Sequence, residues 1–405
     1  MRLSSFVALL AVLPVQLCSQ DAGAVRAAAN TITPADVQHR ISVLAHDSMK
    51  GRSTTRPEIE KAARYISGEF RKLGLKAGGD QETFLGRYSV VRGRIDTDAS
   101  RIAAGDGLIW RFGRDFLTSG RDLVDIETSG AALVVTGVPD TAAVPSLGVN
   151  RAIVIFAPSA GSGASPAQIN AVLAALRAAG PAAILAPLSA PDSIWDLLAA
   201  RQRQPLTRRS WDPIDVPLLV VREQTISRLL ASHGIDLAAV RGAGHPLRAT
   251  ALPLQISVTL RAAIVTRTAA PNVIGILEGR DPALKNEYVV FSAHMDHLGV
   301  RSPDASGDSI YNGADDDASG TAAVIELAQA YAGLRVRPKR SLIFLTVSGE
   351  EDGLYGSDAF AARPPVPVGQ IVADLNIDMV GRNWKDTIVA IGQEHSDLGP
   401  TLHRV

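Results

Sequence analysis

Four short clusters near the end of the chain contain side chains that can bind a metal ion. They are Ala293–His297, Gly313–Gly320, Gly349–Gly353 and Asn376–Met379, with the sequences AHMDH, GADDDASG, GEEDG and NIDM. Imidazole with several carboxylates suits zinc, and a pair of zinc ions bridged by a carboxylate and a water suits hydrolysis of a peptide bond. An adjacent carboxylate can take the proton from that water and later pass it to the departing amine. The clusters therefore point to one two-metal hydrolytic site.

The segments around these clusters predict a sheet that would bring them together. After about residue 271, apolar strands are expected at 272–277, 288–293, 341–347 and 371–379, with a helix at 319–333. Such an alternation of strands and helices predicts an α/β fold, with a mostly parallel sheet sandwiched by helices. Sites in these sheets lie at the carboxyl ends of the strands. Several acids gathered there would repel one another unless a cation sat among them.

The N-terminal part of the chain predicts two helices and an inserted domain. Thr33-Pro34-Ala35-Asp36 predicts the start of a helix that runs to about Ala45, and an apolar stripe predicts a second helix from about Pro57 to Gly74. From about 128 to 250, short β-branched strands surround one helix. This pattern resembles a protease-associated domain, and an ordinary α/β insertion without a separate role is the alternative.

These expectations divide the chain into four parts. They are a signal peptide at 1–24, an N-terminal helical part of the peptidase domain with a linker at 25–127, the insertion at 128–250 and the catalytic domain at 251–405.

Each cluster alone has an ordinary structural explanation. The acid triplet at 315–317 could be a solvated turn or a helix cap, the glutamate pair a charged loop, and His294 a core histidine. Asp378 is expected inside an apolar strand, where an unpaired acid would be costly. A metal site explains all four clusters at once, although the spacing does not choose among Asp315, Asp316 and Asp317 as the ligand.

The clusters in this order resemble the co-catalytic zinc aminopeptidases of metallopeptidase family 28. The matching motifs are HxDHxG at 294–299, GADDDASG at 313–320, GEExGLxGS at 349–357 and DMxG at 378–381. The resemblance covers about 33–79 and about 271 to the end. It implies a zinc exopeptidase fold and six site residues: His294 as a ligand of one zinc, Asp316 as the bridge between the ions, Glu351 as a ligand of one zinc and Asp378 as a ligand of the other, Glu350 as the general base, and Asp296 as the partner that orients His294.

The family adds one more zinc-binding histidine, in a Ser-Asp-His type motif well beyond the Asp-Met strand. Neither His395 nor His403 has that sequence context, so we assign neither as a ligand. We therefore expect this chain, which ends at Val405, to be a fragment of a longer enzyme. A sheet that stopped here would expose an unpaired edge.

Charge and the N-terminus limit the location and the partners. Lys+Arg and Asp+Glu are equal at 41 each, so no charge excess favours nucleic acid or an anionic membrane. Arg2, the apolar run 6–17 and small residues near Ala24 predict a signal peptide and export to the periplasm or outside the cell, with no membrane span. The single cysteine, Cys18, lies in this leader, which leaves no disulfide in the mature chain.

These patterns predict a metallo-exopeptidase, most simply an aminopeptidase acting on peptides with two zinc ions. Two alternatives remain open at this point. One keeps the fold but changes the reaction, to a carboxypeptidase-like dipeptidase or a glutaminyl cyclase. The other is a binding module whose metal site is vestigial. The sequence does not determine side-chain preference, oligomeric state or the role of the insertion.

Overall fold

The computed structural model of the chain describes residues 22–105, 107–119, 125–159, 163–209, 215–242, 244–385 and 387–403. The chain forms two compact units, one from Met1–Tyr88 with Ala270–Val405 and the other from Ser89–Ala269. The signal peptide predicted at 1–24 lies almost entirely outside the described residues, which begin with α1 (Ala22–Ala29). The inserted unit begins and ends further out than the predicted 128 and 250, because strands before 128 and after 250 pair within its sheet.

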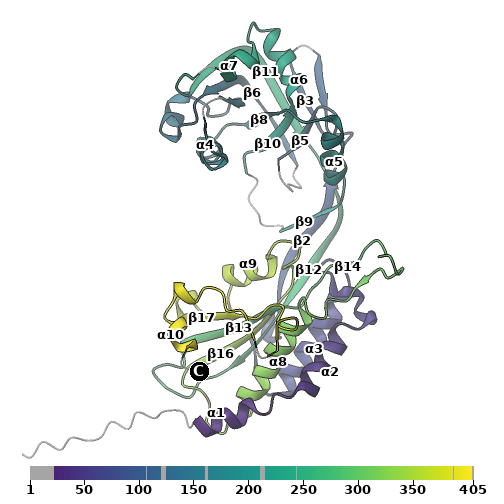
Figure 1. Ribbon diagram of the computed structural model, residues 1–405, viewed down its shortest axis with the longest axis vertical. Coiled ribbons are helices and arrows are strands. Elements are labelled where there is room, and N and C mark those ends of the chain that lie inside the picture. The colour runs from purple at the N-terminus through teal and green to yellow at the C-terminus, as the bar shows by residue number, and fades with distance from the viewer. Residues whose placement is uncertain are drawn as a thin grey trace, which may run out of the picture. The chain divides into compact units, whose positions relative to one another are not determined.

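The sheet that carries the clusters has the strand order β17-β13-β16-β12-β2-β9, with β1 also paired to β12 (Figure 1). Its central strands are β13 (Tyr288–His294), β16 (Ser341–Val347) and β12 (Ala262–Leu277). Strands β17 (Ile371–Asn376) and β16 both run parallel to β13, whereas β12 runs antiparallel to β16. On the other side of β12, β2 (Leu85–Ile95) pairs antiparallel with β9 (Leu206–Arg209).

The prediction of a mostly parallel sheet is therefore wrong, and the sheet is mixed. The reason lies in the connections between the strands. Helix α8 (Ala318–Ala332) connects β13 to β16, and α9 (Tyr355–Ala362) connects β16 to β17, so these strands run parallel. Between β12 and β13 there is only a short loop without a helix, and a parallel return requires a longer crossover.

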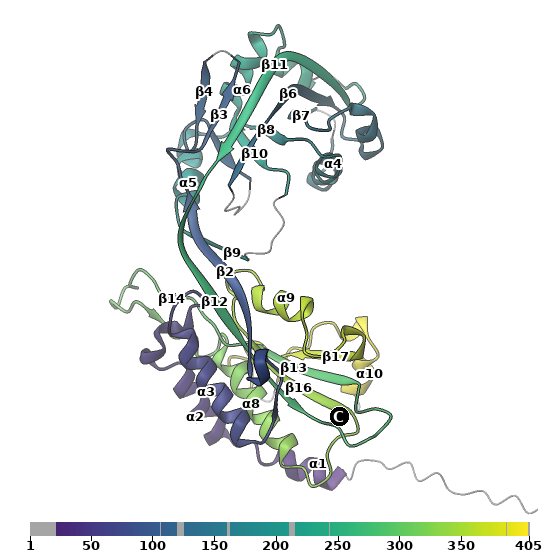
Figure 2. The same ribbon diagram turned by 180° about the vertical axis from the view of Figure 1, so that it is seen from behind.

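Helices α2 (Pro34–Leu44), α3 (Ile59–Lys72) and α8 cover one face of this sheet, and α9 covers the other (Figures 1 and 2). The predicted apolar stripe of α3 is confirmed, since Ile59, Ala63, Ile66 and Phe70 are buried. They pack in one core with Phe344 of β16. Neighbouring residues on the same strand, such as Ile343 and Leu345, enter a second, smaller core on the opposite face.

An ionic network inside the first unit links the three helices. Arg40 on α2, whose side chain is 8% exposed, lies 2.5 Å from Glu326 of α8 and 2.7 Å from Glu69 of α3. The Arg40 guanidinium also donates a hydrogen bond to Gln329 of α8. Because an unpaired ion in the interior is strongly destabilising, the Arg40 guanidinium and the Glu326 carboxylate each depend on the other to remain charged and buried.

The inserted unit contains a sheet of order β4-β3-β11-β6-β7-β8-β10-β5. Strands β6 to β7, β7 to β8 and β8 to β10 pair in parallel, and β11 and β5 are antiparallel to their neighbours. Two apolar cores lie in this unit, one around Trp195 and one around Phe156. Its likeness to a protease-associated domain stays a hypothesis. Its elements are β3 (Arg101–Ala104), β4 (Leu108–Arg111), β5 (Phe116–Thr118), β6 (Ile126–Gly137), β7 (Ile153–Pro158), α4 (Pro166–Ala178), β8 (Ala183–Leu188), α5 (Asp192–Gln202), β10 (Leu218–Arg222), α6 (Glu223–Ala231), α7 (Leu237–Gly242) and β11 (Arg248–Leu260).

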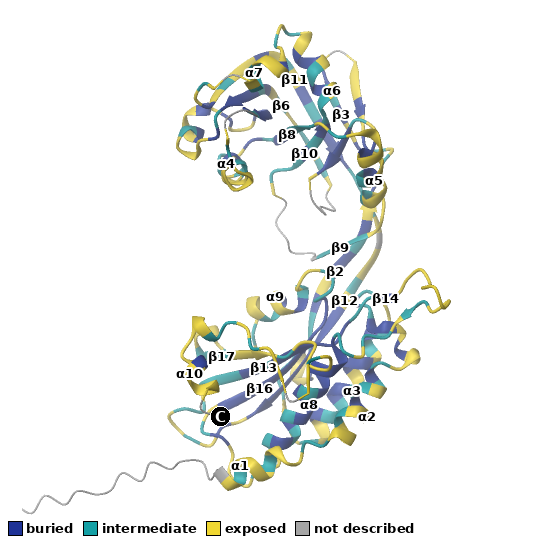
Figure 3. Ribbon diagram, viewed as in Figure 1, coloured by how far each residue is buried: buried dark blue, intermediate teal, exposed yellow. Residues whose placement is uncertain are grey.

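Strand β17 forms one edge of the first unit's sheet and pairs only with β13 among the described strands. It ends at Asn376 rather than at the predicted 379, so Asp378 lies in the loop after the strand. Burial decreases along this edge, where β17 alternates between half-buried and exposed residues before becoming wholly exposed (Figure 3).

In the part of the chain that the structure describes, no helix is long and apolar enough to cross a membrane. Shorter elements complete the unit: β1 (Lys76–Ala77), β14 (Gly299–Val300), β15 (Ile310–Tyr311) and α10 (Leu398–Leu402).

Candidate metal centre

His294 is the last residue of β13, and its side chain lies beside acids from three other segments. Its Nε2 atom is 3.0 Å from Asp316 Oδ1, 3.6 Å from Asp378 Oδ1 and 3.9 Å from Glu350 Oε2. The imidazole is 3% exposed, whereas the Asp378 side chain, beyond the end of β17, is 40% exposed. His294, Asp316 and Asp378 together offer one nitrogen and two oxygens close enough to hold a single cation.

His297 forms a second group with the other oxygen of Asp316. Its Nδ1 atom lies 2.6 Å from Glu351 Oε1 and 3.7 Å from Asp316 Oδ2. The sequence predicted Asp316 and Glu351 as ligands but gave His297 no role. The sequence does place His297 only three residues after His294. His297 lies in the loop after the strand, where strand alternation does not fix the direction of its side chain, so it could face the same site.

Asp316 has a position between the two groups. One carboxylate oxygen faces His294 and the other faces His297. Two atoms bound tetrahedrally to one zinc, at about 2.0 to 2.1 Å each, lie about 3.3 Å apart. The separations around His294, 3.0 and 3.6 Å, lie on either side of that value. Asp316 is thus the one acid of the triplet placed to bridge two cations.

The other two acids of the triplet hold the surrounding backbone. Asp317, which is fully buried, caps α8 by accepting a hydrogen bond from the Gly320 N–H at 2.8 Å. It also accepts from the main-chain N–H groups of His294 and Met379. Asp315 accepts from the Gly381 N–H at 2.8 Å. The helix-cap explanation is therefore correct for Asp317, and the peptide bond that joins it to Asp316 is cis.

The two glutamates lie in a loop, as their different predicted roles require. Strand β16 ends at Val347, and Gly349 follows with a φ of +76°, so strand alternation no longer applies. Glu350 faces His294, and Glu351 faces His297. Adjacent residues therefore present their carboxylates to different halves of the centre.

Asp296 links the loops that carry these side chains. Its carboxylate accepts hydrogen bonds from the Thr54 hydroxyl at 2.9 Å and the Glu350 N–H at 3.3 Å. Thr54 Oγ1 in turn accepts from the Gly349 N–H at 2.8 Å. The Nδ1 atom of His294 lies 3.1 Å from the main-chain oxygen of Asp296 and 3.6 Å from its carboxylate. Asp296 therefore contacts His294 as predicted, with its main-chain oxygen nearer than its carboxylate.

Arg52, which the sequence did not single out, is fully buried beneath the same loops. Its guanidinium donates hydrogen bonds to four main-chain oxygens, those of Leu44 (2.7 Å), Met295 (2.7 Å), Asn312 (2.6 Å) and Gly313 (2.8 Å). Burial lowers the pKa of Arg52 to about 10, opposed by the charges of nearby acids, so the side chain remains a cation at neutral pH. Arg52 alone thus holds the main chain of the loops that precede Asp296 and Asp316.

The electrostatics of the centre favour a bound cation. Burial raises the pKa of Glu351 to about 7, helped by the charges of Asp316 and Asp296. Burial likewise raises the pKa of Glu350. Burial lowers the pKa of His294, but the hydrogen bond and charge of Asp296 outweigh it, and the pKa is raised to about 10. Cations relieve this crowding of negative charge, and nitrogen with carboxylate oxygen is a donor set suited to zinc.

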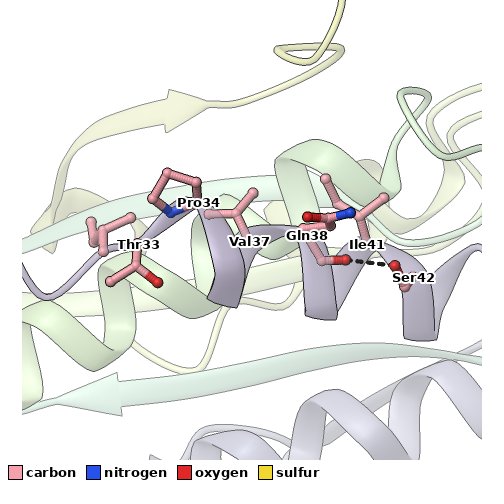
Figure 4. A pocket seen from close by; sticks show the side chains of 7 residues that line it. Thr33, Pro34, Val37, Gln38, Ile41 and Ser42 are labelled. Atoms are coloured by element: carbon pink, nitrogen blue, oxygen red, sulfur yellow. Dashed lines mark hydrogen bonds between the residues drawn. The ribbon is translucent and has the colours of Figure 1, made fainter.

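A cavity on α2, of about 500 Å³, has a different character (Figure 4). Its walls come from Ile32, Thr33, Pro34, Val37, Gln38, Ile41 and Ser42. The Ser42 hydroxyl donates to the Gln38 carbonyl at 2.7 Å. Because this lining contains no titratable side chain, it offers no group for acid–base chemistry.

Comparison with known proteins matches the segment that holds the centre. The family model described as Peptidase family M28 matches residues 272–403. This part of the chain belongs to peptidase family M28. A probable zinc metalloprotease of Pyrenophora teres f. teres (strain 0-1) is 35% identical over 112 residues, which cover 27% of this chain and 23% of that protein. A probable zinc metalloprotease of Pyricularia oryzae is 36% identical over 141 residues, covering 33% of this chain and 27% of that protein.

Among solved structures, the aminopeptidase from Aneurinibacillus sp. strain AM-1 is similar with a TM-score of 0.43 and 19% identity, covering 86% of this chain and 70% of that one. The chain spans about a quarter of the length of the curated relatives it matches. The family M28 match includes every predicted site residue, from His294 to Asp378.

Proposed function

We propose that this chain carries the centre of a zinc-dependent exopeptidase of the aminopeptidase type. The observation that supports this most directly is the position of Asp316, whose two oxygens face two histidines on opposite sides of one carboxylate. His294, Asp316 and Asp378 would hold one zinc, and Asp316 with Glu351 would hold the second. The metalloprotease names of the relatives agree with this chemistry.

Zinc bound at these positions would polarise the carbonyl of the scissile bond and lower the pKa of an attacking water. Glu350 would act as the general base that takes the proton from this water and then delivers it to the departing amine. Its carboxylate is about one-third exposed, and burial raises its pKa, which makes it a stronger base than a solvated glutamate. Its place 3.9 Å from His294 Nε2 puts it beside the ligands.

Asp296 would fix the positions of Glu350 and His294 relative to each other. It accepts from the Glu350 N–H and contacts His294 Nδ1 through its main-chain oxygen. Partners behind a metal-bound histidine fix its tautomer and ring orientation. Replacement of Asp296 should therefore affect both metal binding and catalysis.

Hydrolysis of aminoacyl-nitroanilides by the full-length protein loaded with zinc is the direct test. We expect hydrolysis that a chelator abolishes and added zinc restores. Glu350→Gln should retain zinc while losing at least about a hundredfold in rate, since a general base contributes that much or more. Glu394→Gln, in the exposed segment near the C-terminus, is a matched control that should change neither. Full activity in Glu350→Gln would refute the role of this base.

Export is a further proposal, supported only by the apolar run with a preceding arginine in residues 1–24. N-terminal sequencing of protein secreted by cells that express the gene should show a mature chain starting near Ala24. A protein recovered only from the cytoplasm with its first residues intact would contradict export.

A further inference from the structure

We propose that Tyr88 is a positioning residue for Glu350. Its hydroxyl holds the peptide unit between Ser348 and Gly349 in one orientation, and this orientation sets where the Glu350 carboxylate points. The inference rests on the proposed function, in which Glu350 is the general base. Tyr88 lies on β2, 260 positions before Ser348 in the chain, and none of the four sequence motifs includes it.

Both polar groups of the Ser348–Gly349 peptide unit have buried partners. The Tyr88 hydroxyl donates a hydrogen bond to the Ser348 carbonyl at 2.6 Å, and the Gly349 N–H donates to Thr54 Oγ1 at 2.8 Å. Tyr88 is 2% exposed and Ser348 is fully buried, so water does not compete for these groups. Burial also raises the pKa of Tyr88, so its hydroxyl keeps the proton that it donates. Opposite ends of one planar peptide unit are therefore fixed by two side chains.

The glycine at position 349 makes this restraint necessary. Gly349 has a φ of +76°, and a residue without a Cβ can also reach other orientations of the preceding peptide at little cost. A Cβ added to Gly349 would lie 2.6 Å from the Tyr88 hydroxyl oxygen, so the tyrosine packs directly against this residue. Without the hydroxyl, the Ser348 carbonyl would be buried without its donor, and the peptide unit would be free to rotate. The main chain of Glu350 would move with it.

The main-chain groups on either side of this peptide unit are held as well. The Ser348 N–H donates to the Asn272 side chain at 3.2 Å. The Glu350 N–H donates to the Asp296 carboxylate at 3.3 Å, and the Glu350 carboxylate lies 3.9 Å from His294 Nε2. A rotation between these two anchored points would shift the carboxylate away from His294. A reacting group misplaced by about 1 Å can cost about a hundredfold in rate.

The experiment compares Tyr88→Phe with wild type in the full-length protein loaded with zinc. We expect kcat for an aminoacyl-nitroanilide to fall about 10- to 100-fold, while KM and zinc content stay nearly unchanged. Tyr331→Phe is the matched control and should keep the wild-type kcat, since this ring packs on Phe291 and Phe344 in the apolar core. In a Glu350→Gln background, Tyr88→Phe should cause no further loss, because a residue that acts only through the base has nothing left to position.

Amide hydrogen exchange of the turn, followed by mass spectrometry on the metal-free protein, gives a readout apart from activity. Exchange across residues 348–351 should be about five- to tenfold faster in Tyr88→Phe, as expected when one hydrogen bond of ordinary strength is lost. Circular dichroism checks folding. If Tyr88→Phe does not fold, Thr54→Val decides in its place, because it frees the other end of the same peptide unit and should also lower kcat.

A wild-type kcat in Tyr88→Phe, or unchanged exchange across the turn, would overturn the proposal. So would a fall in kcat that only follows a loss of bound zinc, or a further tenfold loss in the Glu350→Gln background. If wild type hydrolyses no peptide but exchange is faster in Tyr88→Phe, the role of Tyr88 in holding the turn stands and the proposed function fails.

Discussion

Replacement of Arg52 by methionine tests how the loops of the centre are held together. Methionine fills much of the same volume but cannot donate the four hydrogen bonds that Arg52 makes to Leu44, Met295, Asn312 and Gly313. Each such bond contributes about 1 kcal/mol, and each buried oxygen left without a donor costs a similar amount or more. We therefore expect Arg52→Met to lower the free energy of unfolding by about 4 kcal/mol.

The assay is urea unfolding of the metal-free chain, followed by fluorescence and circular dichroism so that the transitions of the two units can be separated. Arg64→Met, at an exposed position on the same helix as the α3 stripe, is the control and should change the free energy by less than about 0.5 kcal/mol. Zinc affinity should fall about 10- to 100-fold in Arg52→Met, because the main chain around Asp296 and Asp316 loses its support. A loss of stability below about 1 kcal/mol would refute the reasoning, since a single ordinary hydrogen bond contributes that much.

Three further predictions follow from the same geometry. Arg40→Met should destabilise the first unit by about 3 to 5 kcal/mol in the same urea assay, because Glu326 is left buried without its cation, and Arg40→Met combined with Glu326→Leu should recover most of the loss. Asp317→Ala should weaken binding of the zinc held by Asp378 about 10- to 100-fold in a zinc titration, because the Met379 N–H loses its acceptor, while Asp315→Asn should change it less. Zinc binding should release protons: the pKa of His294, which burial lowers but Asp296 raises more, is about 10, so its proton is displaced at neutral pH and affinity rises with pH up to about 10. Calorimetry in two buffers of different ionisation enthalpy measures this release, and a proton count of zero at pH 7 would contradict it.

The sequence predicted the elements that apolar patterns define. Strand β16 has the predicted bounds, and α2, α3 and α8 lie within one or two residues of theirs. The predicted site residues also come together as expected, since their clusters follow strands of one sheet. The relative direction of the strands was harder to predict, because a strand pattern does not show whether the next connection contains a helix. Strand β12 is antiparallel to β16, contrary to the prediction of a mostly parallel sheet.

The residues that were missed are those whose role depends on distant contacts. Arg52 and Thr54 lie in a short polar loop between two helices, where nothing local distinguishes a buried arginine from a solvated one. Apart from Leu44, the partners of Arg52 lie more than two hundred residues away in the chain, as does the Asp296 partner of Thr54. Asp378 was placed inside an apolar strand, but β17 ends before it, and the Asp317 contact with Met379 fixes the following loop. Tertiary contacts of this kind leave no periodic signal.

The first unit is built from two separate stretches of the chain, and this affects the order in which its parts are synthesised. Thr54 is separated from Asp296 by 242 positions and from Gly349 by 295, with the whole inserted unit between them. A ribosome completes the inserted unit before it makes β13 or β16, so that unit has all its own partners first. Helices α2 and α3 are made before the inserted unit, yet β16, whose Phe344 packs in one core with Ile66 and Phe70, is made after it. We expect chaperones to bind nascent chains at the apolar stripe of α3, and to leave when β16 emerges.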